Sequence, residues 1–171
     1  KVIKRKQLLT KKMRIINFNS NILILIDEPR WFSNSINEIR KTIAACNFKN
    51  KAFSVKLSNN KYIKKLNLKW RGINKPTNVL SFPNYSECIL KDEYCYLGDI
   101  VLGYETIKKE SIEKNIPINK HLSHILVHGI LHLNGYKHND RRAEHIMQKE
   151  EIRILKKLNI NNPYYLEKKS L

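Results

Sequence analysis

The chain has 171 residues, of which 33 are lysine or arginine and 15 are aspartate or glutamate, so its formal net charge is +18. This length suits one domain of about 150 residues with a real core, and 42% hydrophobic residues is ordinary for a globular protein. The sequence contains no run of roughly 18 apolar residues, so we expect no membrane span. Its three cysteines form no C-x-x-C pair, which excludes a zinc ribbon or a disulfide framework.

The excess positive charge favours a polyanionic partner. Because basic side chains neutralise phosphates and release their counterions, we expect nucleic acid before a membrane surface. Solvated lysines that reflect coding bias are the alternative source of part of this charge. Residues 1–12 carry six basic side chains and no acidic one, which predicts a flexible basic arm before a single domain at 13–171. The arm lacks the apolar stretch of a secretory signal, so we expect a cytoplasmic protein.

Strand patterns come first along the chain and helical patterns follow. Short or alternating apolar runs predict strands at 14–19, 22–26, 53–57, 78–82 and 97–103. Apolar residues at helical spacing predict helices at about 31–43, 58–66, 105–114, 118–134 and 140–158. This order predicts an α+β domain in which a small mixed β-sheet is packed with about five helices.

Two local expectations concern the segment between the early strands and the late helices. Ser58 is expected to cap the helix that ends near Leu66, which leaves the basic stretch 69–76 as a loop before the next strand. Residues 84–95 are expected to form a loop or a short hairpin.

Histidine clusters strongly in one part of the chain, because all six histidines lie within residues 121–145. His128 and His132 are four residues apart, so they lie on one face of the expected helix, one turn from each other. Gly135 is expected to end this helix in the left-handed conformation that glycine tolerates. The chain then turns, and this turn is expected to bring His138 back toward the same face.

The resulting pattern, H-x-x-x-H-x-x-G-x-x-H, has metzincin spacing. Structural zinc is usually held by four ligands rich in cysteine, whereas three histidines leave a position for water or substrate. We therefore predict a catalytic site on a helix and its following turn, with one zinc ion, or another ion such as nickel, held by His128, His132 and His138. In the proteases a glutamate follows the first histidine, but Gly129 stands here, which disfavours peptide hydrolysis. The alternative is that these histidines are ordinary half-buried side chains.

Neighbouring polar residues have less defined roles. His124 is the only other histidine whose spacing would let it replace a ligand, whereas His121 and His145 are expected nearby or on the surface. Asp99 either orients a ligand imidazole or caps a turn, and both roles remain open.

Three aromatic side chains are candidates for stacking on RNA bases: Trp31, Trp70 and Tyr136. Aromatic residues at such spacing are more often part of the core. Only Tyr136, next to the glycine turn, stands close to the predicted ligands.

Three motifs occur in a fixed order: RGINKPTNVLSFP at 71–83, LGDIVL at 97–102 and HGILHLNGYKH at 128–138. Over about residues 13–165 the chain resembles the YbeY family of metal-dependent endoribonucleases, which mature ribosomal RNA. The resemblance implies a mixed sheet packed with helices, three histidine zinc ligands and a functional arginine at Arg71. It also implies a single-strand-specific endoribonuclease that acts in ribosomal RNA processing and ribosome quality control. Its partners would be ribosomal RNA and the ribosome, and no DNA is expected.

One position departs from the family pattern. The aspartate that usually precedes the third histidine is replaced by Lys137. A role for that carboxylate in orienting a ligand therefore cannot be transferred to this chain. Asp140 is close enough in sequence to substitute for it.

The candidate residues suit phosphodiester chemistry. An ion held by three neutral imidazoles keeps its full charge, which can lower the pKa of bound water from 15.7 toward about 7. Arg71 lies among the cations of the basic stretch and can give a phosphate a permanent bidentate donor. The main alternative is a non-catalytic, ribosome-associated RNA-binding assembly factor, and a second is a metallohydrolase of another bond, such as a peptide.

Overall fold

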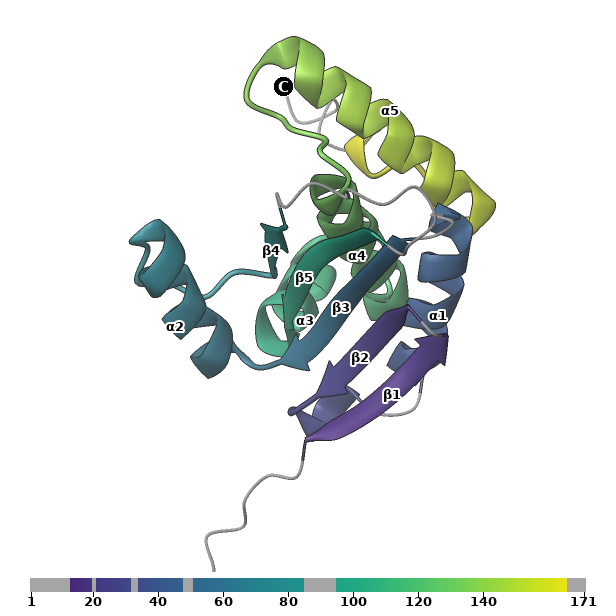
Figure 1. Ribbon diagram of the computed structural model, residues 1–171. Helices are drawn as coiled ribbons and strands as arrows, with labels where there is room; N and C mark the ends of the chain where they lie inside the picture. The colour runs from purple at the N-terminus through teal and green to yellow at the C-terminus, as the bar shows by residue number, and fades with distance from the viewer. Residues whose placement is uncertain (1–12, 20, 32–33, 48–50, 85–94, 166–171) are drawn as a thin grey trace, which may run out of the picture.

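The computed structural model describes residues 13–19, 21–31, 34–47, 51–84 and 95–165 (Figure 1). It contains five strands: β1 (Arg14–Asn19), β2 (Ile22–Ile26), β3 (Lys51–Ser58), β4 (Val79–Pro83) and β5 (Cys95–Gly103). The described helices are α1 (Asn34–Cys46), α2 (Asn60–Arg71), α3 (Tyr104–Glu113), α4 (Ile118–Leu133) and α5 (Arg141–Lys157), with short 3-10 helices at Pro29–Trp31 and Pro163–Tyr165. The predicted α+β class and its five helices are confirmed.

The strands form one mixed sheet in the order β1-β2-β3-β5-β4. The inner pairs β2 with β3 and β3 with β5 are parallel, whereas β1 and β4 pair antiparallel with their neighbours at the two edges. In β3, the alternate residues Phe53, Val55 and Leu57 are all buried in the main core. In this strand order β4 is an edge strand, and it lies beside the three predicted histidine ligands.

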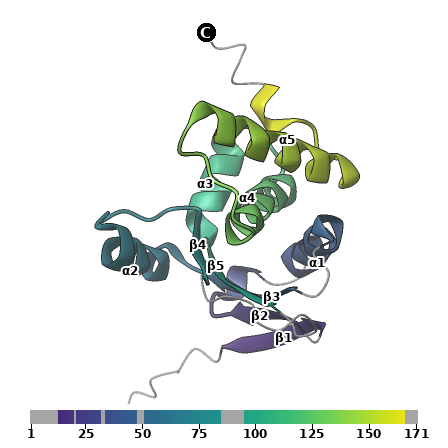
Figure 2. The same cartoon turned by 45° about the horizontal axis from the view of Figure 1, so that its top comes forward.

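The main core lies between one face of the sheet and helices α1, α3 and α4 (Figure 2). Helix α4 is the central element of this layer, because it contacts α1, α3, α5 and the strands β4 and β5. Helix α5 packs against α1 and α4. Consequently most residues of α4 are buried.

The expected first helix starts later than its pattern predicted. Trp31 belongs to a 3-10 turn before α1, where it is fully buried and its indole N–H donates to the Ser58 carbonyl at 2.8 Å. The aromatic ring thus contributes to the core from outside the helix.

Helix α2 lies to the side of the sheet and contacts β4 and β5 (Figure 1). Its buried Ile63 packs with Leu80 and Val101 in a second, small core cluster. Ser58 does not cap this helix, because it is the last residue of β3. Asn59 is the cap, and its side chain accepts the Tyr62 backbone N–H at 3.0 Å.

The end of α2 also differs from the expectation. The helix extends through Arg71, and Gly72 terminates it in the left-handed conformation with φ of 71°. Residues 69–71, expected in a loop, are therefore helical. Because glycine adopts this conformation without strain, the helix can continue until it reaches Gly72.

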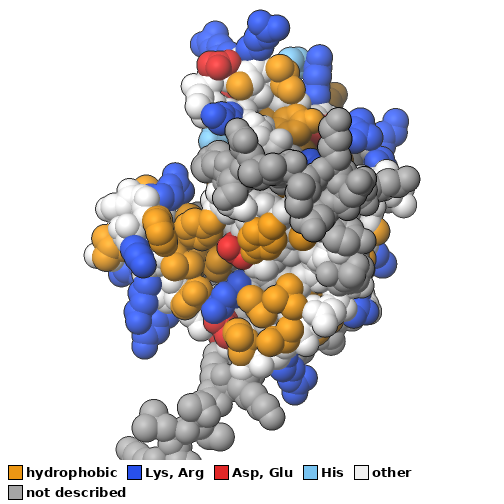
Figure 3. Space-filling model, in the orientation of Figure 1, with side chains coloured by type: hydrophobic (Ala, Val, Ile, Leu, Met, Phe, Trp, Pro, Cys, Tyr) orange, Lys and Arg blue, Asp and Glu red, His pale blue; other side chains and the backbone are white. Residues whose placement is uncertain are grey.

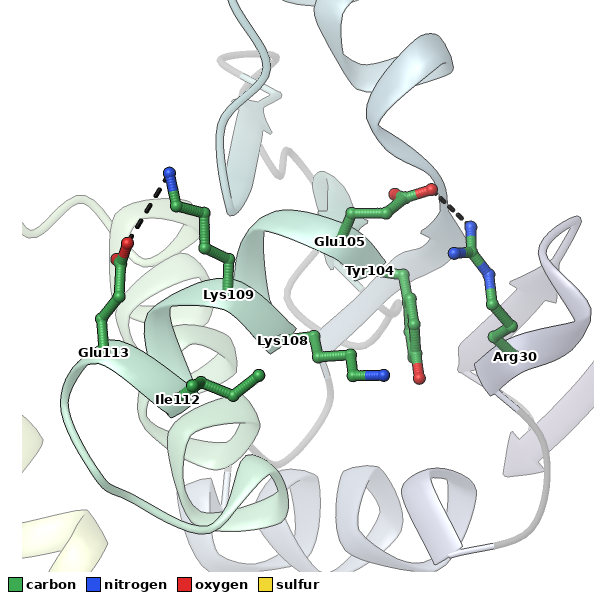
Figure 4. Close-up of a pocket in the computed structure, with 7 residues that line it drawn as sticks. All are labelled: Arg30, Tyr104, Glu105, Lys108, Lys109, Ile112 and Glu113. Atoms are coloured by element: carbon green, nitrogen blue, oxygen red, sulfur yellow. Dashed lines mark hydrogen bonds and ion pairs between the residues drawn. The ribbon is translucent and has the colours of Figure 1, made fainter.

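A polar cluster anchors the start of α2 against α3. The Glu105 carboxylate accepts the Asn60 backbone N–H at 2.7 Å and pairs with Arg30. Figure 4 shows this pair beside a surface hollow over α3, together with the Lys109–Glu113 ion pair at 3.6 Å. Arg30 and Lys109 are each paired with a carboxylate, so these two cations offer little free charge to an added anion.

Two predictions fall largely or wholly outside the described residues. The basic arm at 1–12 is one, and most of the loop expected at 84–95 is the other. The single domain predicted at 13–171 stays a prediction. None of the helices in the described ranges combines the length and apolar character that a bilayer crossing demands.

Candidate metal centre

The structure brings the three predicted ligands together. His128, His132 and His138 each offer a ring nitrogen, and these atoms lie within 4.8 Å of one another. The Nε2 atoms of His128 and His132 are 3.0 Å apart. Two nitrogens bound to one tetrahedral zinc at 2.0–2.1 Å would be about 3.3 Å apart, so small rotations of the rings suffice. The donor set and its spacing therefore fit one imidazole-bound transition metal.

The glycine turn delivers the third histidine as predicted. Gly135 has φ of 87°, and the Tyr136 N–H donates back to the Leu131 carbonyl at 3.1 Å. This bond closes the Schellman turn that commonly ends a helix at glycine. It redirects the chain so that the His138 ring stacks on the His128 ring, with centroids 5.7 Å apart.

Hydrogen bonds orient two of the imidazoles for ligation. His132 Nδ1 lies 3.0 Å from the Tyr136 carbonyl oxygen, and His128 Nδ1 lies 2.7 Å from a Glu151 carboxylate oxygen. Both acceptors require a proton on Nδ1, which leaves the Nε2 lone pairs directed into the site. Burial lowers the pKa of His132, and the neighbouring His128 lowers it further. The neutral form that binds a metal is therefore favoured.

Glu151 is the side chain that organises the far side of the site. It is only 1% exposed, and it accepts hydrogen bonds from His128 and from the Tyr164 hydroxyl. The His124 Nε2 atom is 3.7 Å away. Burial raises the pKa of Glu151, but its interactions with His124 and His128 outweigh this effect, so the pKa lies below its ordinary value.

Sequence reasoning missed Glu151, although the sequence held a signal for it. On α5 the buried positions include Met147, Ile154 and Leu155, and Glu151 falls on the same face. Because an acidic residue is almost never buried without a partner, its place on an apolar stripe indicates a buried cation or donor.

Neither acidic candidate named from the sequence orients an imidazole. Asp140 caps α5, where its side chain accepts the Ala143 backbone N–H at 2.9 Å. Among the described residues, Asp99 contacts none of the three histidines and caps no turn. It lies on β5, where it accepts hydrogen bonds from Ser54 and Tyr96 on the open face of the sheet. Both roles proposed for Asp99 are therefore wrong.

The other three histidines lie outside the ligand group. His121 is buried and its Nε2 lies 2.7 Å from the Glu110 carboxylate. His124 is outside the ligand group and packs against Glu151 and the Tyr164 ring. His145 is exposed on α5. Thus His124, the possible substitute ligand, lies behind the site.

The glycine after the first ligand has a packing reason. A Cβ atom on Gly129 would meet Ser81 Oγ and a Val79 methyl, both at 3.2 Å. The Ser81 hydroxyl also donates to the Gly129 carbonyl at 3.2 Å. Because α4 lies this close to β4, any side chain at this position would be tightly packed against Ser81 and Val79.

Arg71 lies at the same hollow as the histidines. This hollow measures about 410 Å³ and is lined by Arg71, the three histidines and residues of β4 and the segment before it. Arg71 is exposed at the end of α2 and has no ion pair in the described part of the chain. Its charge is therefore available to an anion in the hollow.

Among the three aromatic candidates, exposure singles out a different residue from the one expected. Trp31 is fully buried, and Tyr136, which is half-buried, packs against the main core. Trp70 is 62% exposed. Only Trp70 therefore offers an open ring surface.

The buried carboxylate predicts a measurable loss of metal affinity. Glu151→Gln keeps the shape of the side chain but removes its charge, so we expect metal affinity to fall by about 10 to 100-fold. Glu150→Gln, the neighbouring substitution at a residue that pairs with Arg153, should leave affinity unchanged. Competition titration with a chromophoric chelator measures both. Equal affinities for the two variants would show that Glu151 does not support the ligands.

The fold and the site define an α+β protein in which one helix and its following turn bring three histidines together beside an arginine. The sequence model of the family Endoribonuclease YbeY matches residues 16–159. The Endoribonuclease YbeY of Ehrlichia chaffeensis is 49% identical over 111 residues, which cover 65% of this chain and 70% of that protein. The Endoribonuclease YbeY of Sinorhizobium medicae is 43% identical over 111 residues, which cover 65% of this chain and 66% of that protein.

A solved structure agrees with these sequence matches. The solution structure of TM1509 from Thermotoga maritima superposes with a TM-score of 0.52 at 26% identity, over 81% of this chain and 91% of that one. The chain belongs to the YbeY endoribonuclease family, and the resemblance in the three motifs is confirmed.

Proposed function

We propose that this protein is a cytoplasmic, metal-dependent endoribonuclease that cleaves single-stranded RNA during ribosomal RNA maturation and ribosome quality control. One observation carries the proposal: the Nε2 atoms of His128 and His132 face each other in the hollow that Arg71 also lines. The family membership supports RNA as the substrate.

The three histidines would hold the ion, with zinc as the first candidate. A bound zinc ion supplies Lewis acidity and lowers the pKa of a coordinated water. The chain contributes orientation, because the Tyr136 carbonyl and Glu151 keep both Nδ1 atoms protonated. The imidazoles therefore need only small ring rotations before they bind.

Arg71 would bind the scissile phosphate. Its planar guanidinium offers parallel N–H donors to two phosphate oxygens. Because the charge on these oxygens changes in the transition state, a donor placed beforehand lowers the barrier. Its position at the end of α2 places this donor in the wall of the histidine hollow.

The charge of the whole chain supports an RNA partner. A net charge of +18 raises the local concentration of a polyanion and favours contacts with its phosphates. Gly129 disfavours the rival peptide hydrolase, because it stands where such a protease carries the glutamate that serves as its general base. The other rival, an RNA-binding assembly factor without cleavage, would use the same positive charge, so a direct test must separate it from the endoribonuclease.

The test is cleavage of RNA by the purified full chain with its metal content measured on the same preparation. We expect about one metal ion per chain and cleavage of a single-stranded RNA in preference to a duplex of the same sequence. Chelation should stop cleavage, and added zinc should restore it. RNA binding without cleavage by the metal-replete protein would establish the assembly factor instead.

A further inference from the structure

We propose that a second hollow, on the open face of the sheet, binds a nucleobase of the same RNA strand and prefers a base that carries an amino group. The inference rests on the proposed function and adds a recognition site to it. The hollow measures about 850 Å³ and lies between α2 and strands β3, β4 and β5. Figure 3 shows hydrophobic side chains gathered over this face, with basic side chains near them.

This base hollow is continuous with the histidine hollow. Four residues line both of them: Arg71, Leu80, Ser81 and Pro83. Three of these residues belong to the edge strand β4, so the two hollows adjoin along this strand and at Arg71. A strand whose phosphate contacts Arg71 therefore has an adjacent base within reach of the base hollow.

An exposed aromatic ring provides the stacking surface. Trp70 is 62% exposed, and its ring meets the Phe82 ring edge-on with centroids 6.1 Å apart. The Lys69 ammonium lies 5.0 Å from the Trp70 ring centroid. Single-stranded nucleic acids bind proteins through this combination of aromatic surfaces for bases and nearby cations for phosphates.

A fixed carboxylate provides base selectivity. Asp99 Oδ1 accepts hydrogen bonds from the Ser54 hydroxyl and from the Tyr96 hydroxyl, the latter at 2.5 Å. The other oxygen of Asp99 has no hydrogen bond among the described residues. An ionised carboxylate only accepts hydrogen bonds, so it suits the N4 amino group of cytosine and repels the O4 carbonyl of uracil.

The charges around Asp99 leave this preference intact. Lys56, which also lines the hollow, is engaged by Asp27 at 3.2 Å and lies over the Tyr62 ring, 4.0 Å from its centroid. The negative Asp99 would repel a phosphate, whereas Arg71 at the border would attract one. The hollow therefore suits a base, with the backbone of the strand at its Arg71 edge.

The test compares short oligocytidine with oligouridine, which differ at the base edge that Asp99 would read. Binding to the full chain is measured in chelator, where metal-dependent cleavage does not interfere. The chain has two tryptophans, and Trp31 is buried, so quenching of the exposed Trp70 reports stacking. We expect oligocytidine to quench this fluorescence and to bind on the order of tenfold more tightly than oligouridine.

Variants separate recognition from folding. Trp70→Ala should lose the quenching and weaken both oligonucleotides on the order of tenfold. Asp99→Asn should move the preference toward oligouridine, because an amide can donate to a carbonyl. Ile112→Ala truncates an exposed apolar residue on α3, away from the base hollow, and should change neither the affinity for the oligonucleotides nor the preference between them.

The outcomes distinguish this inference from the proposed function. If Asp99→Asn keeps the wild-type preference and Trp70→Ala keeps wild-type affinity, the base hollow does not bind RNA and a protein partner becomes its candidate occupant. Cleavage by the wild-type protein would then still stand. Conversely, base preference without cleavage by the metal-replete protein would overturn the endoribonuclease and leave the base hollow in place.

Discussion

Replacing His128 and His132 together with alanine is expected to abolish metal binding and to lower RNA cleavage on the order of 10³-fold or more. Two of three donor atoms are lost, and the remaining His138 is exposed on a turn. A metal contributes several kcal/mol of charge stabilisation in the transition state, which corresponds to a rate factor of this size. Elemental analysis and single-turnover cleavage on the same preparation measure both effects.

The matched control is His145→Ala, because His145 is an exposed histidine on α5 outside the ligand group. It should keep wild-type metal content and rate. Circular dichroism should show that the double variant keeps its helices, since the ligand side chains are only partly buried. Full metal occupancy in the folded double variant would show that the three histidines are not the metal ligands.

Arg71→Ala is expected to keep metal and fold while cleavage falls on the order of 10²-fold. A preorganised charge donor acts on the transition state, and its loss has about this cost. Arg71→Lys should recover only part of the rate, since an ammonium cannot reproduce the planar pair of donors. Metal content separates this effect from that of a ligand substitution, because only a ligand substitution should lower it.

Arg40→Ala is the control for Arg71, since it removes an exposed arginine from α1 and changes the net charge equally. If the loss at Arg71 came from general charge, both variants would bind and cleave RNA equally poorly. A wild-type rate for metal-replete Arg71→Ala would remove this residue from the mechanism and strengthen the non-catalytic assembly factor.

Much of the fold followed from local patterns. The strand predicted at 14–19 agrees with β1, and the late helices agree with α3, α4 and α5 to within two residues at their ends. Apolar periodicity indicates these elements well because each has one face in the core. The errors lie where a neighbouring element decides the boundary: Ser58 is used by β3, so the cap moves to Asn59.

The sequence by itself determined that His128, His132 and His138 come together, because i,i+4 spacing and a glycine turn are local geometry. Only the tertiary structure decided what surrounds the triad. Glu151 meets His128 through the packing of α5 on α4, and Arg71 reaches the hollow because α2 packs against β4 and β5. Such contacts join residues far apart in the chain, and their spacing depends on how whole elements pack, which no local pattern encodes.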